Sequence, residues 1–340
     1  MRRVYLKSLF DNVETKGRRT DIDILKGIGI LTVIYYHFGT AGMLSDYFSS
    51  FHMLLFFGVS GYCYKVNSLL CSPKCYIIKK IKAFIRPYLL WVSIYTFINF
   101  AMDFRSHSLQ GVANYLLNIV ESYMKFGAVW FLMAIFITTL ISATIIDYIK
   151  SNSLKVVIGL IPMFIAIVGI KLNLPTVFRW QQAFMCVPVF IMCNIFHDSI
   201  VDRIIRNLNF SRLVGVVFVC GVTGGICAIM NGSVVLSRLE LGKSITLFYF
   251  SAFLSIFAWY SISVSISKQK LQCFSSVFSF LGRNTIYILI THQIVIRIVS
   301  IICARILSGV PSVLIGFFIV TILEITICCL CETKILKWMF

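Results

Sequence analysis

Apolar residues along this chain come in blocks of about 20, and short polar stretches separate the blocks. A block of this length can cross the hydrocarbon core of a bilayer, about 30 Å thick, as one α-helix. The pattern predicts an all-α polytopic integral membrane protein with about ten transmembrane helices. We place these helices at residues 22–43, 48–66, 84–102, 127–146, 154–170, 176–195, 212–230, 245–266, 284–304 and 311–331.

The polar stretches between the blocks leave no room for a soluble domain. The longest ones, residues 1–20 and 103–126, are too short to bury a core of their own. We therefore predict a basic cytoplasmic N-terminal tail at residues 1–20 and a single transmembrane domain at residues 21–340. The first apolar block is too long for a signal peptide and further blocks follow it, so we expect it to remain as an uncleaved helix.

Composition and charge give the predicted helices a direction. The chain is 59% hydrophobic and 13% charged, and its mean hydropathy of +0.90 excludes a water-soluble globular protein. A net charge of +18 would suggest a nucleic-acid partner in a soluble protein. Here most Lys and Arg residues fall on the side of the N-terminus, which predicts cytoplasmic termini and the lipid bilayer, not nucleic acid, as the partner. The 12 cysteines lie mostly within blocks or on the cytoplasmic side, so we expect neither disulfides nor a metal site.

Ionisable side chains inside a transmembrane helix are costly and therefore suggest function. In the first block, Lys26 and His37 are 11 residues apart, so they share one helix face at an axial separation of roughly 16 Å. A long substrate with an anionic head and a reactive tip could contact both. The alternative is that Lys26 extends to the cytoplasmic headgroups while His37 forms a hydrogen bond within the bundle.

Further polar residues in the other blocks have both a functional and a structural interpretation. His52 lies near the outer end of the second block, and Ser60 follows in a glycine-containing segment that also suits close helix packing. A basic run leads from the cytoplasm into the third block, where phosphate binding and attraction to anionic lipids are equally good explanations. Glu324 could orient a histidine or neutralise a basic residue. The members of the basic run are Lys79, Lys80, Lys82 and Arg86.

Aromatic and amide side chains near the predicted outer surface suit a sugar. Trp130 begins the fourth block, and Arg179, Trp180 and Gln182 begin the sixth. An interfacial aromatic belt with polar neighbours explains the same residues without a ligand. The ninth block begins near Asn284 and places a further histidine, His292, near mid-depth.

These elements, in this order, resemble the acyltransferase-3 family of multipass membrane O-acyltransferases, especially its branch of polysaccharide and sugar O-acetyltransferases. The resemblance covers essentially the whole chain and is most specific at Lys26 and His37, where the family has a basic residue, Gly, a hydrophobic run and His. Many members have arginine instead of Lys26, so phosphate attraction is retained here without a bidentate contact. The other matching segments are Phe56–Tyr62, Lys79–Pro87, Trp130–Leu132, and Gly282, Asn284, Thr285 and His292.

The resemblance implies transfer of an acetyl group from cytoplasmic acetyl-CoA to a hydroxyl of a cell-surface or lipid-linked polysaccharide, in a bacterial inner membrane. It implies His37 as the general base or as an acyl-histidine nucleophile, with His292 and Ser60 positioning the acceptor or stabilising the oxyanion. The sequence does not decide whether the protein is a monomer or an oligomer. The expected CoA contacts are Lys26, Lys79, Lys80, Lys82 and Arg86, and the expected acceptor contacts are His52, Tyr62, Trp130, Arg179, Trp180, Gln182 and Asn284.

A transporter or flippase for an anionic or glycan substrate is the alternative function, because charges inside the membrane with a basic cytoplasmic entrance also describe a substrate pathway. Paired broken helices and repeat symmetry, which transport folds often have, are not detected in the sequence. Binding of acetyl-CoA distinguishes the two functions.

Overall fold

A computed structural model describes residues 18–38, 42–103, 127–269, 272–306 and 310–331. Within these ranges the chain is helical, and the only β-structure is one isolated antiparallel bridge between Val235 and Glu240. This confirms the all-α prediction. The backbone contacts divide the chain into two compact units, one formed by the residues up to Cys63 together with those from Cys193, and one formed by Tyr64–Met192.

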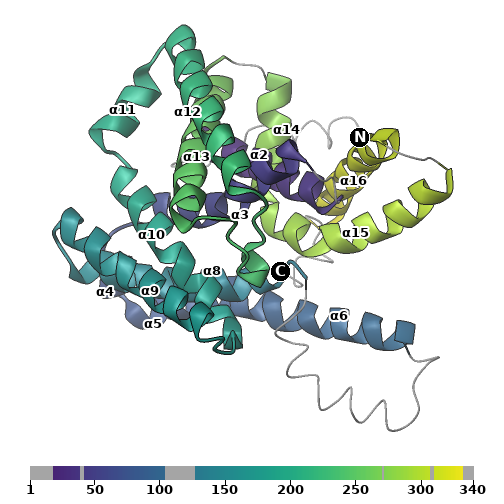
Figure 1. Ribbon diagram of the computed structural model, residues 1–340, viewed down its shortest axis with the longest axis horizontal. Coiled ribbons are helices and arrows are strands. Elements are labelled where there is room, and N and C mark those ends of the chain that lie inside the picture. The colour runs from purple at the N-terminus through teal and green to yellow at the C-terminus, as the bar shows by residue number, and fades with distance from the viewer. Residues whose placement is uncertain (1–17, 39–41, 104–126, 270–271, 307–309, 332–340) are drawn as a thin grey trace. The chain divides into compact units, whose positions relative to one another are not determined.

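The first unit is organised around its first helix, α2 (Thr20–His37). This helix packs against α3 (Met43–Tyr62), α13 (Ile245–Lys268) and α14 (Gln272–Arg283), and it also contacts the last two helices of the chain (Figure 1). Most of its apolar residues are buried. The other elements of the unit are the end of α10 (Trp180–Phe196), α11 (Ile200–Asn207), α12 (Phe210–Asn231), η4 (Leu236–Arg238), α15 (Thr285–Ile306) and α16 (Val310–Cys331).

In the second unit, a short π-helix interrupts the α-helical backbone just before a proline. The five residues Ile81–Ile85 form a π-helix, η1, directly before Arg86 and Pro87. Pro87 has no N–H to donate and its ring crowds the preceding turn, so the wider π turn accommodates it. The elements of this unit are α4 (Ser68–Cys71), α5 (Pro73–Lys80), η1, α6 (Arg86–Asp103), α8 (Trp130–Tyr148), α9 (Asn152–Lys171), η3 (Val177–Arg179) and α10 as far as Met192.

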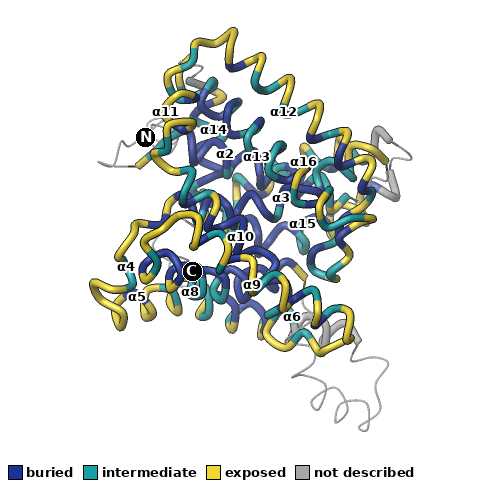
Figure 2. The backbone as a smooth tube through the Cα atoms, turned by 60° about the vertical axis from the view of Figure 1, so that its left-hand side comes forward, coloured by how far each residue is buried: buried dark blue, intermediate teal, exposed yellow. Residues whose placement is uncertain are grey.

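Six of the described helices are long and apolar enough to cross a membrane, or seven if the bent pair Val177–Phe196 and Ile200–Asn207 is one span. In three of them, α9, α12 and α16, only 22% of the residues in the apolar segment are buried. Figure 2 shows the exposed residues along α12. Exposed apolar helix faces of this kind suit contact with lipid. The count of ten and the cytoplasmic location of both termini stay predictions.

A helix lies within each predicted span, but the structure differs from the expectation in two places. The first helix ends at His37 instead of residue 43, and the next begins at Met43 after Gly42, which has a φ of +122° that favours glycine. The second difference is α14, which the sequence pattern did not predict because a helix of 12 residues is too short to cross the bilayer. Of the predicted tail, only Arg18, Arg19 and Thr20 lie within the described residues.

Candidate active site

Two glycines allow α14 to pack directly on α2. A Cβ atom at Gly27 would lie 2.1 Å from the carbonyl oxygen of Phe278, and one at Gly282 would lie 1.8 Å from that of Asp23. Any side chain at these positions would force the two backbones apart, because real Cβ atoms essentially never approach an oxygen so closely. The glycines therefore hold α2 against α14, which leads through Asn284 into α15.

Three histidines from three helices gather at the end of α2. The ring centroids of His37 and His292 are 5.0 Å apart, and those of Tyr36 and His52 are 5.1 Å apart. The ring of Tyr36 also lies 5.6 Å from that of its neighbour His37. His52 and His292 are 4% and 0% exposed, whereas His37 is exposed. His37 is therefore the histidine of this cluster that a substrate can reach.

Both buried histidines contact their own helices through Nδ1. The Nδ1 atom of His292 lies 2.9 Å from the carbonyl oxygen of Ile288, and that of His52 lies 2.6 Å from the carbonyl oxygen of Phe48. The Nε2 atom of His292 is buried and has no hydrogen-bond partner among the described residues. The residue before it, Thr291, donates to Glu324 Oε2 at 2.7 Å, and this contact identifies the partner of the buried carboxyl group in α16.

Basic residues occupy the opposite end of α2. Asp23 accepts hydrogen bonds from Arg18 at 2.6 Å and forms an ion pair with Lys26 at 3.0 Å. The side chains of Arg18 and Lys26 are 45% and 26% exposed, whereas that of Asp23 is 6% exposed. Lys26 is thus partly neutralised by Asp23 on its own helix, and Glu324 does not perform this role.

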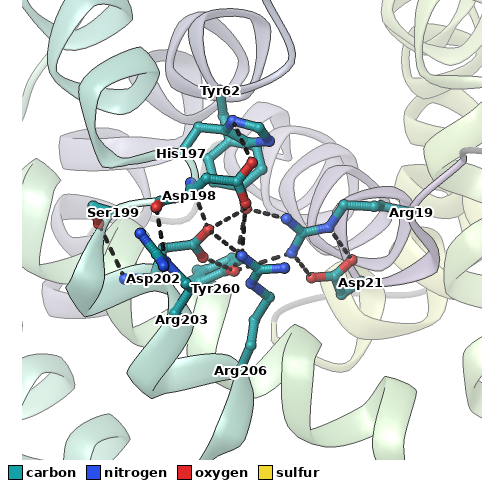
Figure 3. A network of polar contacts seen from close by, with 10 residues as sticks. All are labelled: Arg19, Asp21, Tyr62, His197, Asp198, Ser199, Asp202, Arg203, Arg206 and Tyr260. Carbon is teal, nitrogen blue, oxygen red and sulfur yellow. Dashed lines mark hydrogen bonds and ion pairs between the residues drawn. The ribbon is translucent and has the colours of Figure 1, made fainter.

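A buried polar network extends this charged end of α2 toward α3, α11 and α13 (Figure 3). Asp202 is 0% exposed and accepts from the hydroxyls of Tyr62 at 2.9 Å and Tyr260 at 2.5 Å. Arg206 forms an ion pair with Asp202 at 3.2 Å. Arg19 binds the two tyrosine hydroxyls from the other side.

Arg19 also pairs with Asp21 at the beginning of α2. Burial lowers the pKa of Arg19, but the hydrogen bonds and charge of Asp21, together with Tyr260, outweigh this effect and raise it. The guanidinium therefore remains charged inside the network. Tyr62 was a sequence candidate, whereas the sequence pointed to neither Asp202 nor Tyr260, because their partners lie 140 and 58 residues away along the chain.

Residues 19–331 match the protein family Acyl_transf_3, described as "Acyltransferase domain". The chain belongs to this acyltransferase family. The match confirms the resemblance seen in the sequence, and together with the apolar helices it makes the protein a multi-pass membrane acyltransferase. Neither a comparison with curated proteins nor one with solved structures finds a match.

Two further sequence candidates in the first unit, Ser60 and Asn284, donate hydrogen bonds to backbone carbonyl oxygens four residues earlier in the chain. Ser60 donates to the carbonyl oxygen of Phe56 at 2.8 Å. Ser60 lies eight residues beyond His52 on the same helix, α3. This offset is about 12 Å along the helix axis, so Ser60 is more than two helical turns away from His52. Asn284 is 3% exposed and donates to the carbonyl oxygen of Phe280 at 3.0 Å, at the junction of α14 and α15.

The remaining candidates of the acyltransferase belong to the second unit. Lys79, Lys82 and Arg86 are exposed along the end of α5, η1 and the beginning of α6. The ammonium group of Lys80 lies 5.4 Å from the ring centroid of Tyr76 and 5.6 Å from that of Phe84. Cation–π contacts of this kind hold the lysine along the helix.

Four of the predicted sugar contacts also lie in this unit, with unequal exposure: Trp130, Arg179, Trp180 and Gln182. Trp130 and Gln182 are buried, at 7% and 1% exposed. Trp180 is half-buried, and its ring N–H donates to the carbonyl oxygen of Pro175 at 3.0 Å. Arg179 has a φ of +60°, an uncommon conformation for a non-glycine residue.

Among the residues that the structure describes, no group of three or more His, Cys, Asp or Glu side chains is arranged to hold a metal ion. The three clustered histidines do not form such a group.

Proposed function

We propose that the protein is an O-acetyltransferase that moves an acetyl group from acetyl-CoA to a hydroxyl of a cell-surface or lipid-linked glycan. The observation that carries the proposal is the arrangement of α2, which has basic residues just before it and in its second turn and an exposed histidine, His37, at its end beside His292. Lys26 and His37 are 11 positions apart, which corresponds to roughly 16 Å of helix. An extended thioester donor with an anionic end suits this separation.

The basic end of α2 carries too little positive charge to bind all the phosphates of the donor. The cluster Arg18, Arg19, Asp21, Asp23 and Lys26 contains three cations and two carboxylates, so it retains one net positive charge. A phosphate at Lys26 would compete with Asp23 for the ammonium group. We therefore propose Lys79, Lys80, Lys82 and Arg86 as further phosphate contacts, on the strength of their charge and of the family resemblance.

The proposed reaction uses His37 as a general base. The oxygen of the acceptor hydroxyl forms a bond to the thioester carbonyl carbon, the C–S bond breaks, and CoA leaves as the thiolate. The ring nitrogen of His37 that holds a lone pair takes the hydroxyl proton and then returns it to the thiolate, so that the products are an acetyl ester and the CoA thiol. A positioned base of this kind contributes about 10²–10⁴-fold in rate.

Replacing the histidine tests the reaction. His37→Ala in reconstituted protein should abolish acetyl transfer to glycan, measured as the gain in glycan mass and as release of free CoA thiol. His197→Ala is the control, because His197 is a half-exposed histidine that pairs with the exposed Asp198 at 3.5 Å. Transfer at the wild-type rate by His37→Ala protein that remains monodisperse would overturn the proposal.

Donor binding is tested separately, with labelled acetyl-CoA and detergent-solubilised protein. Lys26→Glu should weaken binding at least tenfold, because it places a carboxylate beside Asp23 where the donor phosphate is expected. Lys171→Glu, at the exposed end of α9, makes the same change in net charge and should leave binding unchanged. Glycan or anion transport without acetyl-CoA binding would favour a transporter instead.

A further inference from the structure

The hydrogen bond at Nδ1 of His292 determines which protonated form of the ring is present. A backbone carbonyl oxygen can only accept, so the Nδ1 atom that lies 2.9 Å from the oxygen of Ile288 must carry the proton. A neutral imidazole has one N–H, and its other nitrogen then holds a lone pair. The ring is 0% exposed and no carboxylate in the described part of the chain is hydrogen-bonded to it, so the neutral form is favoured there.

The lone pair on Nε2 of His292 is therefore available, buried and without a partner among the described residues. It can accept a hydrogen bond but cannot donate one to an oxyanion, which requires donors. This argues against the oxyanion role that the resemblance suggested for His292. A group with an N–H or O–H must instead approach this atom.

The ring of His37 is in position to supply that N–H. Two imidazole rings joined by one hydrogen bond of about 2.9 Å have centroids roughly 5 Å apart, and the observed separation is 5.0 Å with an angle of 47° between the rings. A small rotation of the exposed His37 ring would align its N–H with the lone pair. His52 is constrained in the same way through Phe48, so it too presents Nε2 as an acceptor.

We propose that His292 is the positioning residue for His37: its Nε2 atom accepts the N–H of His37 and so directs the other nitrogen of that ring toward the acceptor hydroxyl. This assigns to a neutral histidine the orienting role that a third group has beside many catalytic bases. When His37 takes the hydroxyl proton, the same lone pair stabilises the resulting imidazolium. The inference rests on the proposed function, but the form of the His292 ring is measurable without any substrate.

The first test is nitrogen NMR of ¹⁵N-histidine-labelled protein in detergent. The chain has five histidines, so single substitutions of the other four assign the His292 signals by exclusion in protein where His292 itself is unchanged. We expect a protonated Nδ1 and an unprotonated Nε2 at neutral pH. A protonated Nε2 would overturn the proposal, whether or not His37→Ala is inactive.

The second test compares two substitutions that differ in hydrogen bonding. In His292→Gln the amide oxygen can occupy the place of Nε2 as an acceptor, whereas His292→Leu has a comparable size and no acceptor. We expect His292→Leu to lower kcat by about 10–100-fold with little change in KM for glycan or acetyl-CoA, and His292→Gln to retain most of the wild-type kcat. Equal kcat values for both variants, or an effect confined to the KM for glycan, would refute the positioning role.

Discussion

Asp202 is the residue of the polar network whose removal should cost most. In Asp202→Ala, the buried hydroxyls of Tyr62 and Tyr260, at 6% and 4% exposed, lose their common acceptor. An unsatisfied buried donor costs about 1–3 kcal/mol, which gives about 2–6 kcal/mol for two. The two hydroxyls lie 3.5 Å apart and can partly satisfy each other, and Arg206 keeps its contact with Asp198. We therefore expect a loss of about 3 kcal/mol in the free energy of unfolding.

Reversible unfolding by SDS in mixed micelles, followed by tryptophan fluorescence, measures this loss. Two variants calibrate it. Asp198→Ala removes an ion pair whose carboxylate is 62% exposed, and solvent screening should limit the loss to about 0.5 kcal/mol. Tyr260→Phe removes one donor and leaves the carboxylate its other partners, so it should cost about 1–2 kcal/mol. If Asp202→Ala is no more destabilising than either control, the network does not stabilise the fold as we argue.

Three further substitutions, one of them with a matched control, test other contacts. Gly282→Ala should destabilise the protein by about 1–3 kcal/mol in the same SDS titration, because its Cβ would collide with the backbone of α2, whereas Gly215→Ala, which meets no atom within 4 Å, should be neutral or slightly stabilising. Asp147→Ala should lower the free energy of unfolding by about 1–3 kcal/mol and increase protease cleavage before α5. The Asp147 carboxylate accepts from the Tyr64 hydroxyl at 2.7 Å and from the backbone N–H groups of three residues that follow Tyr64 in the chain. Glu324→Met should change stability by less than about 1 kcal/mol, since the Oε1 atom of Glu324 is buried without a hydrogen-bond partner among the described residues and the Thr291 hydroxyl that binds Oε2 can still donate to its own helix; a loss above about 3 kcal/mol would contradict this.

The helices were predictable because lipid imposes one length and one composition on every crossing. The two errors in the predicted helices, at the end of α2 and at α14, arise because the prediction relied on that length and composition. The end of α2 at His37 lies inside an apolar run, so hydropathy could not locate it, although the small residues Gly39–Gly42 marked the region. The short helix α14 does not need to reach across the bilayer, so a search for long apolar blocks passes over it.

The candidate site was predictable only where a side chain was unusual in its own segment. His37 and His292 attracted attention because imidazoles inside apolar helices are costly, and the structure brings their rings within 5.0 Å. Asp202 lies in a polar connection, where an aspartate is ordinary. Its importance comes from burial and from tyrosines on two other helices, which no local pattern contains.

The spacing between His37 and His292 depends on a contact more than two turns of helix away from either ring. Gly27 and Gly282 set the distance between α2 and α14, and Asn284 turns the chain from α14 into α15 one residue before that helix begins. Because α15 is one continuous helix from Thr285 onward, we expect a displacement at Gly282 to move His292 with it. The glycine of the late family motif is thus a determinant of imidazole geometry without touching either imidazole. On this argument, Gly282→Ala should lower kcat as well as stability, and a variant that loses stability with an unchanged kcat would show that α15 is positioned by α16 instead.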